Sequence, residues 1–524
     1  MWHSLQRVVF PQDEGLLALY AKRKPAPGKP ASLAIATRFA ADFGDGESFS
    51  FDTYFNAVFE SHWLKWTTVS SWRLSLEVSG RGRVNVYRNR ASGTTSLLST
   101  DEFDGRNQVI RIDVAPSNDA AADTRLYFEI EAEGAPVTLS NATWDGEVAV
   151  VQDVAMAVGF STYNRETYVL ANIETFLSDE LLWQTLQRLI IVEQSEEARL
   201  EEAIATRPQV HDKVQVIRQA NFGGSGGFTR AIMEALDQKQ ATHILLMDDD
   251  VQIEPECILR TVAFFSVASN GVAVGGQMLR LDDPTTMHES GAVLSPKTLR
   301  VLPFDRGQGA HSERMLTQLS QDRRIDYGSW FYFALSLDAV RHVGLPLPFF
   351  IVFDDVEYGM RLARHGTNSV TMPGIAVWHE TGQNRDARWK TYYYQRNVLI
   401  VNALYQLSPA LRPGILFMRH WLRRLIKRDL AQPALACDAL GDYLRGPSVL
   451  GDDPIARTTS ARRLCAATPH RQASTASVVV MALKVVILGC CLALRGPGAN
   501  RSWRAAAAEM TTTAWWRRYL RLSG

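Results

Sequence analysis

The chain has 524 residues, of which 46% are hydrophobic and 21% charged, and its formal net charge is +0. These proportions are ordinary for a globular protein and exclude a disordered chain. At about 100–200 residues per domain, the length predicts two to four domains.

Charge is unevenly distributed along the chain. From Leu411 to the end there are 18 Lys or Arg and 6 Asp or Glu, a net charge of +12, so residues 1–410 carry −12. A basic tail on an acidic body predicts an anionic surface as partner, most simply phospholipid headgroups. No nucleic-acid recognition motif accompanies this charge, and we expect no nucleic-acid partner.

The cysteines and the first residues indicate the compartment. Five cysteines, at positions 257, 437, 465, 490 and 491, show no metal-ligand spacing. The opening stretch Met1–Arg7 lacks the charged-then-apolar pattern of a secretory signal. Both features favour a reduced, cytoplasmic setting.

Residues 1–147 alternate between apolar and polar side chains. The clearest alternating segments are residues 72–78, 83–87, 109–114 and 125–131. Gly80 and Gly82 separate the first two segments and predict a turn, and therefore a hairpin. Several short strands with polar turns predict a β-sandwich.

An aromatic stretch in this region has two interpretations. It consists of Tyr54, Phe55, Phe59, Trp63 and Trp66. Aromatic faces suit the C–H groups of sugars, so these side chains could line a sugar site. At these spacings we favour packing in the core or between domains.

From Val148 the pattern changes to strands that alternate with helices. Strands are predicted at residues 150–159, 189–194, 214–217 and 244–247. This alternation predicts a doubly wound, mostly parallel sheet with right-handed crossovers. Gly223–Gly227 lacks the spacing of a dinucleotide fingerprint and reads as a strand-to-helix turn that lets the backbone approach a ligand.

Three consecutive carboxylates, Asp248–Asp250, end the fourth strand. Adjacent carboxylates repel one another unless a cation lies among them. Mg²⁺ and Mn²⁺ take oxygen ligands and leave positions open for phosphate. Ligands of open α/β sheets bind at the carboxyl ends of strands, where this triplet falls. The alternative is a solvated acidic turn.

A second acidic group, Asp354 and Asp355 with Glu357, follows the apolar stretch 345–353. Helix capping explains one of these acids, whereas a carboxylate in a water-poor cleft could act as a base. His379 follows the apolar run 375–378 and is either structural or the completing ligand of a carboxylate metal site.

The C-terminal region is helical and basic. Residues 421–428 predict a cationic amphipathic helix, and residues 448–475 look loop-like. Residues 477–494 are almost wholly apolar except for Lys484; they are at the short end for a membrane span, and we favour a buried or interfacial helix. Residues 515–521 combine aromatic and cationic side chains, as headgroup anchors do.

Taken together, these motifs are familiar. In order they are Tyr163-Asn164-Arg165, Glu193-Gln194, the segment 221–228, Asp248-Asp249-Asp250, Trp330, the segment 353–359 and Trp378-His379. The set resembles inverting glycosyltransferases of the GT-A fold, in particular the actinobacterial galactofuranosyltransferases that polymerise cell-wall galactan. The opening segment 4–11 and residues 52–56 look similar too.

The resemblance implies a multidomain α+β architecture. An N-terminal β-sandwich would occupy residues 1–147, a central GT-A α/β domain with a mostly parallel sheet residues 148–405, and a basic helical region residues 406–524.

The resemblance also implies a set of donor-binding residues. Tyr163 would stack on uracil. Arg165, Gln194 and Asn221 would hold the nucleotide, with Asp249 beside them.

The same resemblance implies a metal site and a catalytic pair. Asp248, Asp250 and His379 would bind Mn²⁺ or Mg²⁺. Asp355 would be the general base on the acceptor hydroxyl, and Asp354 would position the sugar. Trp330 would form a wall of the acceptor cleft.

Three places depart from the family pattern: Phe331, where a second Trp is expected, the pair Val352-Phe353, and the stretch after His379. They leave the acceptor and the product length open more than the donor.

We therefore expect metal-dependent transfer of galactofuranose from UDP-galactofuranose, with inversion, to a lipid-linked glycan. The enzyme would lie peripherally on the cytoplasmic face of the membrane, against an anionic surface, as a homo-oligomer like its relatives. Two alternatives stay open: transfer of another sugar such as rhamnose or galactopyranose, and a non-catalytic glycan-binding scaffold.

Overall fold

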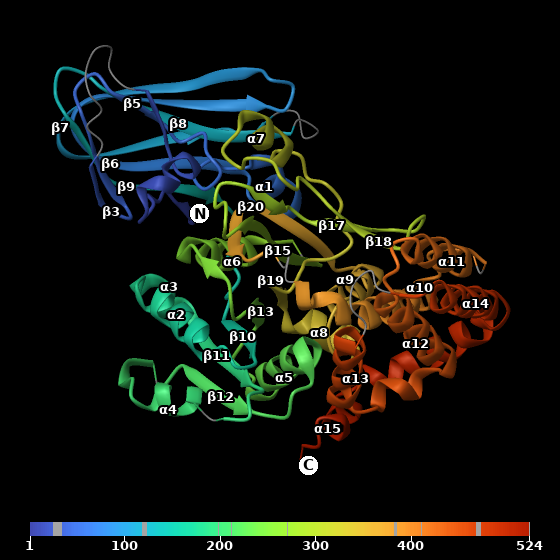
Figure 1. Cartoon of the computed structure of the whole chain (residues 1–524). Coiled ribbons are helices and arrows are strands. Elements are labelled where there is room, and N and C mark those ends of the chain that lie inside the picture. The colour runs from blue at the N-terminus through green and yellow to red at the C-terminus, as the bar shows by residue number, and fades with distance from the viewer. Residues whose placement is uncertain are drawn as a thin grey trace.

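The computed structural model describes residues 1–24, 34–117, 123–197, 199–210, 212–269, 271–381, 385–409, 411–467 and 473–522. It consists of an N-terminal β-rich part, a central α/β part and a C-terminal group of helices (Figure 1). The expected fold class is confirmed.

The β-rich part is one continuous antiparallel sheet. Its strands run in the order β2-β5-β8-β6-β9-β4-β3, with β1 paired to β9 and β7 paired to β6. The strands are β1 (Trp2–Arg7), β2 (Lys22–Lys24), β3 (Ala34–Thr37), β4 (Ala40–Phe43), β5 (Ser48–Ser50), β6 (Ser71–Arg90), β7 (Thr95–Val114), β8 (Thr124–Ala132) and β9 (Val137–Glu147).

The hairpin predicted around Gly80 and Gly82 is wrong. Both segments belong to β6, whose first half pairs with β9 and whose second half pairs with β8. Gly80 has φ +116°, and a Cβ there would lie 2.4 Å from the carbonyl oxygen of Pro136. The glycines therefore redirect one long strand between two halves of the sheet instead of reversing the chain.

The central sheet runs in the order β12-β11-β10-β13-β19-β15-β20-β14, with β16 paired to β15. Its strands are β10 (Met156–Thr162), β11 (Leu186–Glu193), β12 (Val214–Arg218), β13 (His243–Asp248), β14 (Gln252–Ile253), β15 (Val272–Arg280), β16 (Met287–Glu289), β19 (Tyr332–Ser336) and β20 (Asn368–His379). β17 (Ala292–Ser295) and β18 (Arg300–Pro303) form a separate ribbon.

Strand direction decides which residues meet at one edge of this sheet. β10 to β13 are parallel, and β19 is antiparallel to both β13 and β15. Because β20 is parallel to β15, β20 points the same way as β13. The carboxyl ends of β13 and β20 therefore lie at the same edge, where open α/β sheets bind ligands.

Helices cover the central sheet. They are α2 (Glu166–Leu177), α3 (Glu180–Thr185), α4 (Arg199–Ala205), α5 (Gly223–Gln238), α6 (Pro255–Val267), α8 (Leu337–Val343) and α9 (Asp354–Arg364); α1 (Glu60–Trp66) and α7 (Glu313–Leu319) flank the β-rich part. The glycine-rich segment 223–227 forms the first turn of α5, whereas its composition predicts the turn that leads into the helix.

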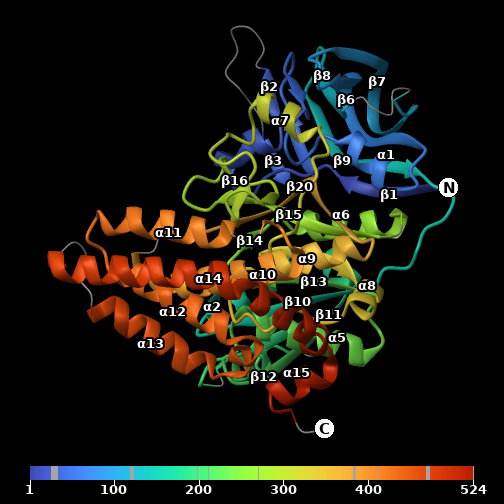
Figure 2. The same cartoon turned by 90° about the vertical axis from the view of Figure 1, so that its right-hand side faces the viewer.

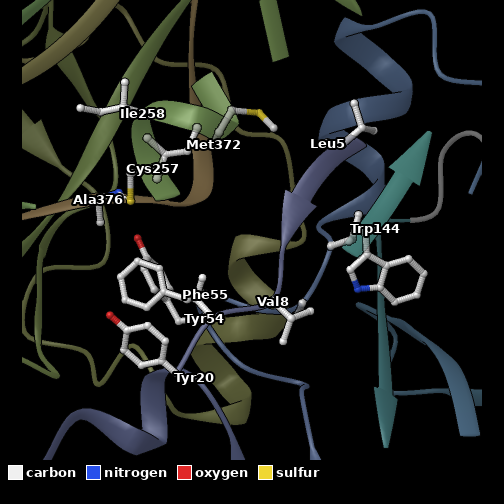
Figure 3. Packing of buried hydrophobic residues seen from close by; sticks show 14 of the residues in the cluster. Leu5, Val8, Tyr20, Tyr54, Phe55, Trp144, Cys257, Ile258, Met372 and Ala376 are labelled. Carbon is white, nitrogen blue, oxygen red and sulfur yellow. Dashed lines mark hydrogen bonds between the residues drawn. The ribbon is translucent and has the colours of Figure 1, made fainter. Parts of the chain in front are cut away.

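The β-rich and α/β parts share a buried interface. The Tyr54 hydroxyl donates to Gln277 Oε1 at 2.6 Å, and the rings of Phe55 and Trp378 lie 5.7 Å apart. Tyr54 and Phe55 project towards Cys257 and Ala376 of the α/β part (Figure 3). The packing interpretation of the aromatic stretch is therefore confirmed for these buried side chains.

Six helices form the C-terminal group: α10 (Thr391–Tyr405), α11 (Arg412–Leu425), α12 (Ala431–Arg445), α13 (Pro454–Ala467), α14 (Thr475–Met510) and α15 (Thr513–Tyr519). α13 occupies part of the stretch 448–475, so the loop prediction is wrong there. α11 lies beside α14 (Figure 2), and their backbones approach closely, since a Cβ on Gly414 would lie 2.6 Å from the carbonyl oxygen of Gly489.

Two predictions about the C-terminal region change. Of the two alternatives for residues 477–494, a buried or an interfacial helix, the buried one is wrong, because only 17% of the most apolar window of α14 is buried. The interfacial alternative stays a prediction, and by length and composition alone α14 could also cross a membrane. α15 is not a free headgroup anchor. Trp516 is fully buried and its Nε1 donates to the carbonyl oxygen of Pro346 at 2.9 Å, while Tyr519 packs on Phe222.

Candidate active site

The sheet edge brings two carboxylates and an imidazole together. Asp248 ends β13, Asp250 follows it, and His379 ends β20. His379 Nε2 lies 3.1 Å from Asp250 Oδ1 and 3.8 Å from Asp248 Oδ2. One ligand atom from each residue lies within 4.8 Å of the others. The three residues predicted as metal ligands thus converge from distant parts of the chain.

The charges of this cluster fit a divalent cation. Burial, with Asp250 and Asp249 nearby, raises the pKa of Asp248 to about 7 despite the opposing charge of His379. Burial opposes ionisation of Asp250, but its hydrogen bond with His379 and the charge of Arg165 lower its pKa to about 2. A divalent cation would favour the ionised form of Asp248.

The tautomer of His379 also fits a ligand role. Nδ1 lies 2.7 Å from the carbonyl oxygen of Glu380, so a proton on Nδ1 is donated there and Nε2 faces the carboxylates. This second hydrogen bond orients the ring, as it does for most metal-bound histidines. The cluster thus offers two carboxylate oxygens and one imidazole nitrogen to a divalent cation.

Arg165 and Tyr163 lie beside this cluster, just after β10. Arg165 Nη1 contacts Asp249 at 3.4 Å and also pairs with Asp250. The Asn172 amide donates to the Asp249 carbonyl oxygen at 2.9 Å and anchors the acidic turn. Tyr163 is 46% exposed, which leaves its ring free to stack on a base.

Gln194 and Asn221 organise the loop before α5. Gln194 Nε2 donates to the Gly223 carbonyl oxygen at 3.0 Å, and its Oε1 accepts from the Phe222 amide at 2.9 Å. Asn221 Oδ1 accepts from the Gly223 amide at 2.9 Å. Both side chains therefore hold backbone in this structure, and Gln194 is buried.

The segment before Asp354 is strained. Phe350, Val352 and Phe353 have φ values of +72°, +66° and +72°. Such values are uncommon outside glycine and cost about 1–3 kcal/mol each, so they persist only where the surroundings impose them. This strained segment, residues 350–353, leads directly into the first turn of α9.

Helix α10 imposes this conformation through the side chain of Asn397. Its Nδ2 donates to the carbonyl oxygens of Val352 at 2.7 Å and Ile351 at 3.0 Å. The neighbouring Arg396 Nη2 donates to the Phe349 carbonyl oxygen at 2.9 Å. Asn397 and Arg396 are buried, and the sequence analysis assigned them no role.

The start of α5 also forms hydrogen bonds with this segment and with Asp354. The Ser225 amide donates to the Phe350 carbonyl oxygen at 3.1 Å, and its hydroxyl donates to Asp354 Oδ2 at 2.8 Å. Gly223 has φ +67°, and a Cβ there would lie 2.2 Å from the Phe350 carbonyl oxygen. The glycine-rich segment therefore approaches protein backbone in addition to any ligand.

Asp355 has the surroundings of a base. Burial, with Asp354 nearby, raises the pKa of Asp355 well above its usual range, and the charges of Glu289 and Asp248 act in the same direction. Phe353 occupies the N-cap position of α9 and makes no side-chain cap, but Asp355 Oδ1 accepts from the Val356 amide in the first turn at 2.7 Å. A hydrogen bond at the helix start therefore accounts for part of the position of Asp355, whereas Asp354 also accepts from the Ser225 hydroxyl.

Glu289 is a further candidate residue that carried no role in the sequence analysis. It ends β16, is buried, and accepts from the Ser329 hydroxyl at 2.8 Å. Burial raises the pKa of Glu289. In the sequence, the only indication of a role for Glu289 was a carboxylate at the end of the short segment Met287–Glu289, before Ser290-Gly291. The pairing of β16 with β15 is what brings Glu289 towards Asp355.

Trp330, which was predicted to form a wall of the acceptor cleft, is almost completely buried. It is 5% exposed, and its ring packs edge-on against Phe228 and Tyr358 at centroid distances of 5.5 and 6.1 Å. Its Nε1 is buried and has no hydrogen-bond partner among the described residues. Tyr358 belongs to α9, so Trp330 supports the helix that carries Asp354 and Asp355.

Two family models match different parts of the chain. A family model described as Galactofuranosyltransferase 2 N-terminal matches residues 5–147, and one described as Glycosyltransferase like family 2 matches residues 155–397. A solved structure of GalNAc-T7 with UDP, GalNAc and Mn²⁺ aligns with a TM-score of 0.39 and 12% identity over 52% of each chain, too weak a likeness to bear on function.

Two curated relatives are galactofuranosyltransferases GlfT2. The protein of Mycolicibacterium smegmatis is 31% identical over 468 residues, which cover 85% of this chain and 72% of that protein. The protein of Mycobacterium tuberculosis is 31% identical over 467 residues, which cover 84% of this chain and 72% of that protein. The chain therefore belongs to the galactofuranosyltransferase GlfT2 family and is a glycosyltransferase.

Proposed function

We propose that this enzyme transfers galactofuranose from UDP-galactofuranose to a lipid-linked glycan, with inversion and with Mn²⁺ or Mg²⁺. The observation that carries the proposal is the opposition of two sites at one sheet edge. Asp248, Asp250 and His379 form one, and Asp355, in the first turn of α9 just after the strained segment, forms the other. The names of the two relatives support galactofuranose as the sugar.

The donor side of the proposal uses the cluster and its neighbours. Asp248, Asp250 and His379 would hold the cation, which neutralises the charge of the leaving diphosphate when bound. Arg165 would contribute a further positive charge, and the exposed Tyr163 ring would stack on the uracil ring of UDP. Asn172 keeps the acidic turn in place through its bond to the Asp249 carbonyl oxygen.

The acceptor side requires one base. Asp355 accepts the proton of the acceptor hydroxyl as the hydroxyl oxygen attacks the anomeric carbon and the bond to the diphosphate breaks. A single displacement inverts the configuration, whereas retention by double displacement would need a nucleophile as well. Asp354, fixed by Ser225, would position the transferred sugar, and Glu289 would help to keep Asp355 basic.

The C-terminal helices support a location at the cytoplasmic face of a membrane. α14 exposes apolar side chains, including Val480, Leu483 and Ile487, and the region from Leu411 onwards is strongly basic. A peripheral attachment of this kind weakens with salt because ions screen the attraction. We further propose that residues 1–147, 148–405 and 406–524 are separate domains.

The test is a panel of UDP- and dTDP-sugars, assayed for hydrolysis and transfer with and without Mn²⁺. We expect metal-dependent turnover of UDP-galactofuranose alone. Asp355→Asn should abolish transfer while UDP binding is retained, and the matched variant Asp338→Asn, at an exposed carboxylate outside the site, should behave as wild type. Turnover of another sugar would refute the donor; an active Asp355→Asn enzyme would refute the base.

A further inference from the structure

A large open cavity lies beside the strained segment, between β18, α10 and α11. Its volume is about 770 Å³, and its wall includes Val352, Tyr394 and Trp421. The Trp421 Nε1 donates to Gln395 Oε1 at 3.2 Å, which ties α11 to α10 across this cavity. None of the residues that we place in the donor or base machinery lines it.

Five cations line the cavity, and none of the lining side chains that the structure describes is a carboxylate: Arg300, Lys390, Arg419, Arg423 and Arg424. Among the described side chains, which do not include that of Asp386, no carboxylate oxygen lies within 4.0 Å of these five. Surface cations of a globular protein need no partner individually, but five of them around one cavity repel one another. An anionic ligand relieves that repulsion.

The positive charges around the cavity also act on His420. Arg300 Nη2 lies 2.9 Å from His420 Nδ1. Burial, with Arg300 and Arg424 nearby, lowers the pKa of His420 to about 4. The imidazole is therefore neutral at physiological pH, and its lone pair accepts from Arg300. Positive charge from β18 and from α11 thus meets at one place in the cavity.

The remaining wall is apolar. Leu299, Val398, Leu416 and Phe417 line it together with the stems of the basic side chains. α11, which forms one side of the cavity, packs on α14 through the close approach of Gly414 to Gly489 (Figure 2). A ligand that matches both parts of the wall has an anionic group followed by a hydrocarbon chain.

The strained segment, residues 350–353, connects the wall of the cavity to Asp355. Val352 lines the cavity, and the ring of Tyr394 lies edge-on 4.9 Å from that of Phe353. Asp355 follows Val352 by three residues, and three residues span at most about 11 Å. The cavity wall at Val352 therefore lies within about 11 Å of the Asp355 backbone.

We propose that this cavity binds the phosphate or diphosphate, and the first part of the hydrocarbon chain, of the lipid that carries the acceptor glycan. This inference rests on the proposed function and deepens it by assigning the non-sugar end of the acceptor to Arg300, Arg424 and their neighbours.

Binding is tested first without turnover. Farnesyl diphosphate, its alcohol and inorganic diphosphate are titrated calorimetrically into the full-length protein, in EDTA so that the metal-dependent donor site does not take the diphosphate. Wild type binds farnesyl diphosphate at least about tenfold more tightly than either comparator, and Arg300→Gln/Arg424→Gln weakens binding about 10- to 100-fold. The matched pair Arg341→Gln/Arg501→Gln, outside the cavity, leaves it unchanged.

Activity provides the second test. One short glycan is supplied on a lipid diphosphate and on a neutral alkyl chain. The cavity variant loses kcat/KM only for the phosphorylated acceptor, with UDP-galactofuranose hydrolysis unchanged. Equal loss with both acceptors, or in the control pair, overturns the proposal. If only attachment to phosphatidylglycerol vesicles falls, the cavity serves bulk headgroups and the proposal is wrong. If wild type transfers no sugar, the proposed function fails, and calorimetry still decides the cavity.

Discussion

Asn397 donates from Nδ2 to the Val352 carbonyl oxygen at 2.7 Å, and this bond holds a non-glycine residue at φ +66° two residues before the pair Asp354-Asp355. The same amide group reaches the Ile351 carbonyl oxygen at 3.0 Å. Strain of this kind is retained only where neighbours over-determine the backbone. The position of Asp355 therefore depends on a helix that contributes nothing to the sheet edge.

Replacing Asn397 by Ala should release the segment 350–353 and lower kcat. Loss of positioning by about an ångström costs on the order of 100-fold in rate. We expect little change in the Kd for UDP, because the residues proposed to bind the nucleotide lie on other loops. Steady-state kinetics measures kcat and a titration with UDP measures the Kd, and Asn402→Ala, at another buried asparagine of α10, is the control. Equal losses in the two variants would mean that the helix, not the contact, matters.

Replacing Gly223 by Ala tests the close contact between the start of α5 and the segment 350–353. The new methyl group would lie 2.2 Å from the Phe350 carbonyl oxygen, at a φ of +67° that disfavours side chains. We expect a loss of transfer of at least about tenfold and a lower melting temperature, since overpacking costs about 1–3 kcal/mol. Gly441→Ala, which meets nothing within 4 Å inside α12, should instead stabilise the protein slightly.

The raised pKa of Asp355 predicts the pH profile of the enzyme. Because the base must be ionised, kcat/KM should rise with pH through a pKa above the usual value of about 3.9. Stability changes in the opposite direction: the native state holds a proton that the unfolded chain releases, so this contribution is lost as pH rises from the unfolded pKa to the folded pKa. Asp355→Asn should remove the dependence of stability on this group and also abolish the rate.

Metal removal should abolish turnover. EDTA treatment is expected to stop transfer, and added Mn²⁺ or Mg²⁺ to restore it and to raise the melting temperature, because a ligand of the native state stabilises that state. His379→Ala should weaken metal affinity, read by the Mn²⁺ concentration needed for half-maximal activity, whereas His342→Ala on α8 should not. Full activity of the wild type in EDTA would rule out the metal-dependent mechanism.

Local patterns in the sequence predicted the four parallel strands β10 to β13 and the acidic turn. The apolar run before Asp248 predicts a buried strand, and the carboxylates that end it predict a ligand site, because both are properties of neighbouring residues. Gly80 shows the limit of such reasoning. A glycine permits a positive φ, but whether the chain reverses or continues depends on which strands pair alongside it.

What the tertiary structure alone decided is which distant groups meet. His379 joins Asp248 and Asp250 because the strand order places β13 and β20 with their carboxyl ends at the same edge. Asn397 supports Asp355, and Trp516 is buried against Pro346, through contacts between segments far apart in the chain. Residue spacing along a chain carries periodicity and turn chemistry, whereas these contacts follow from packing whole elements together.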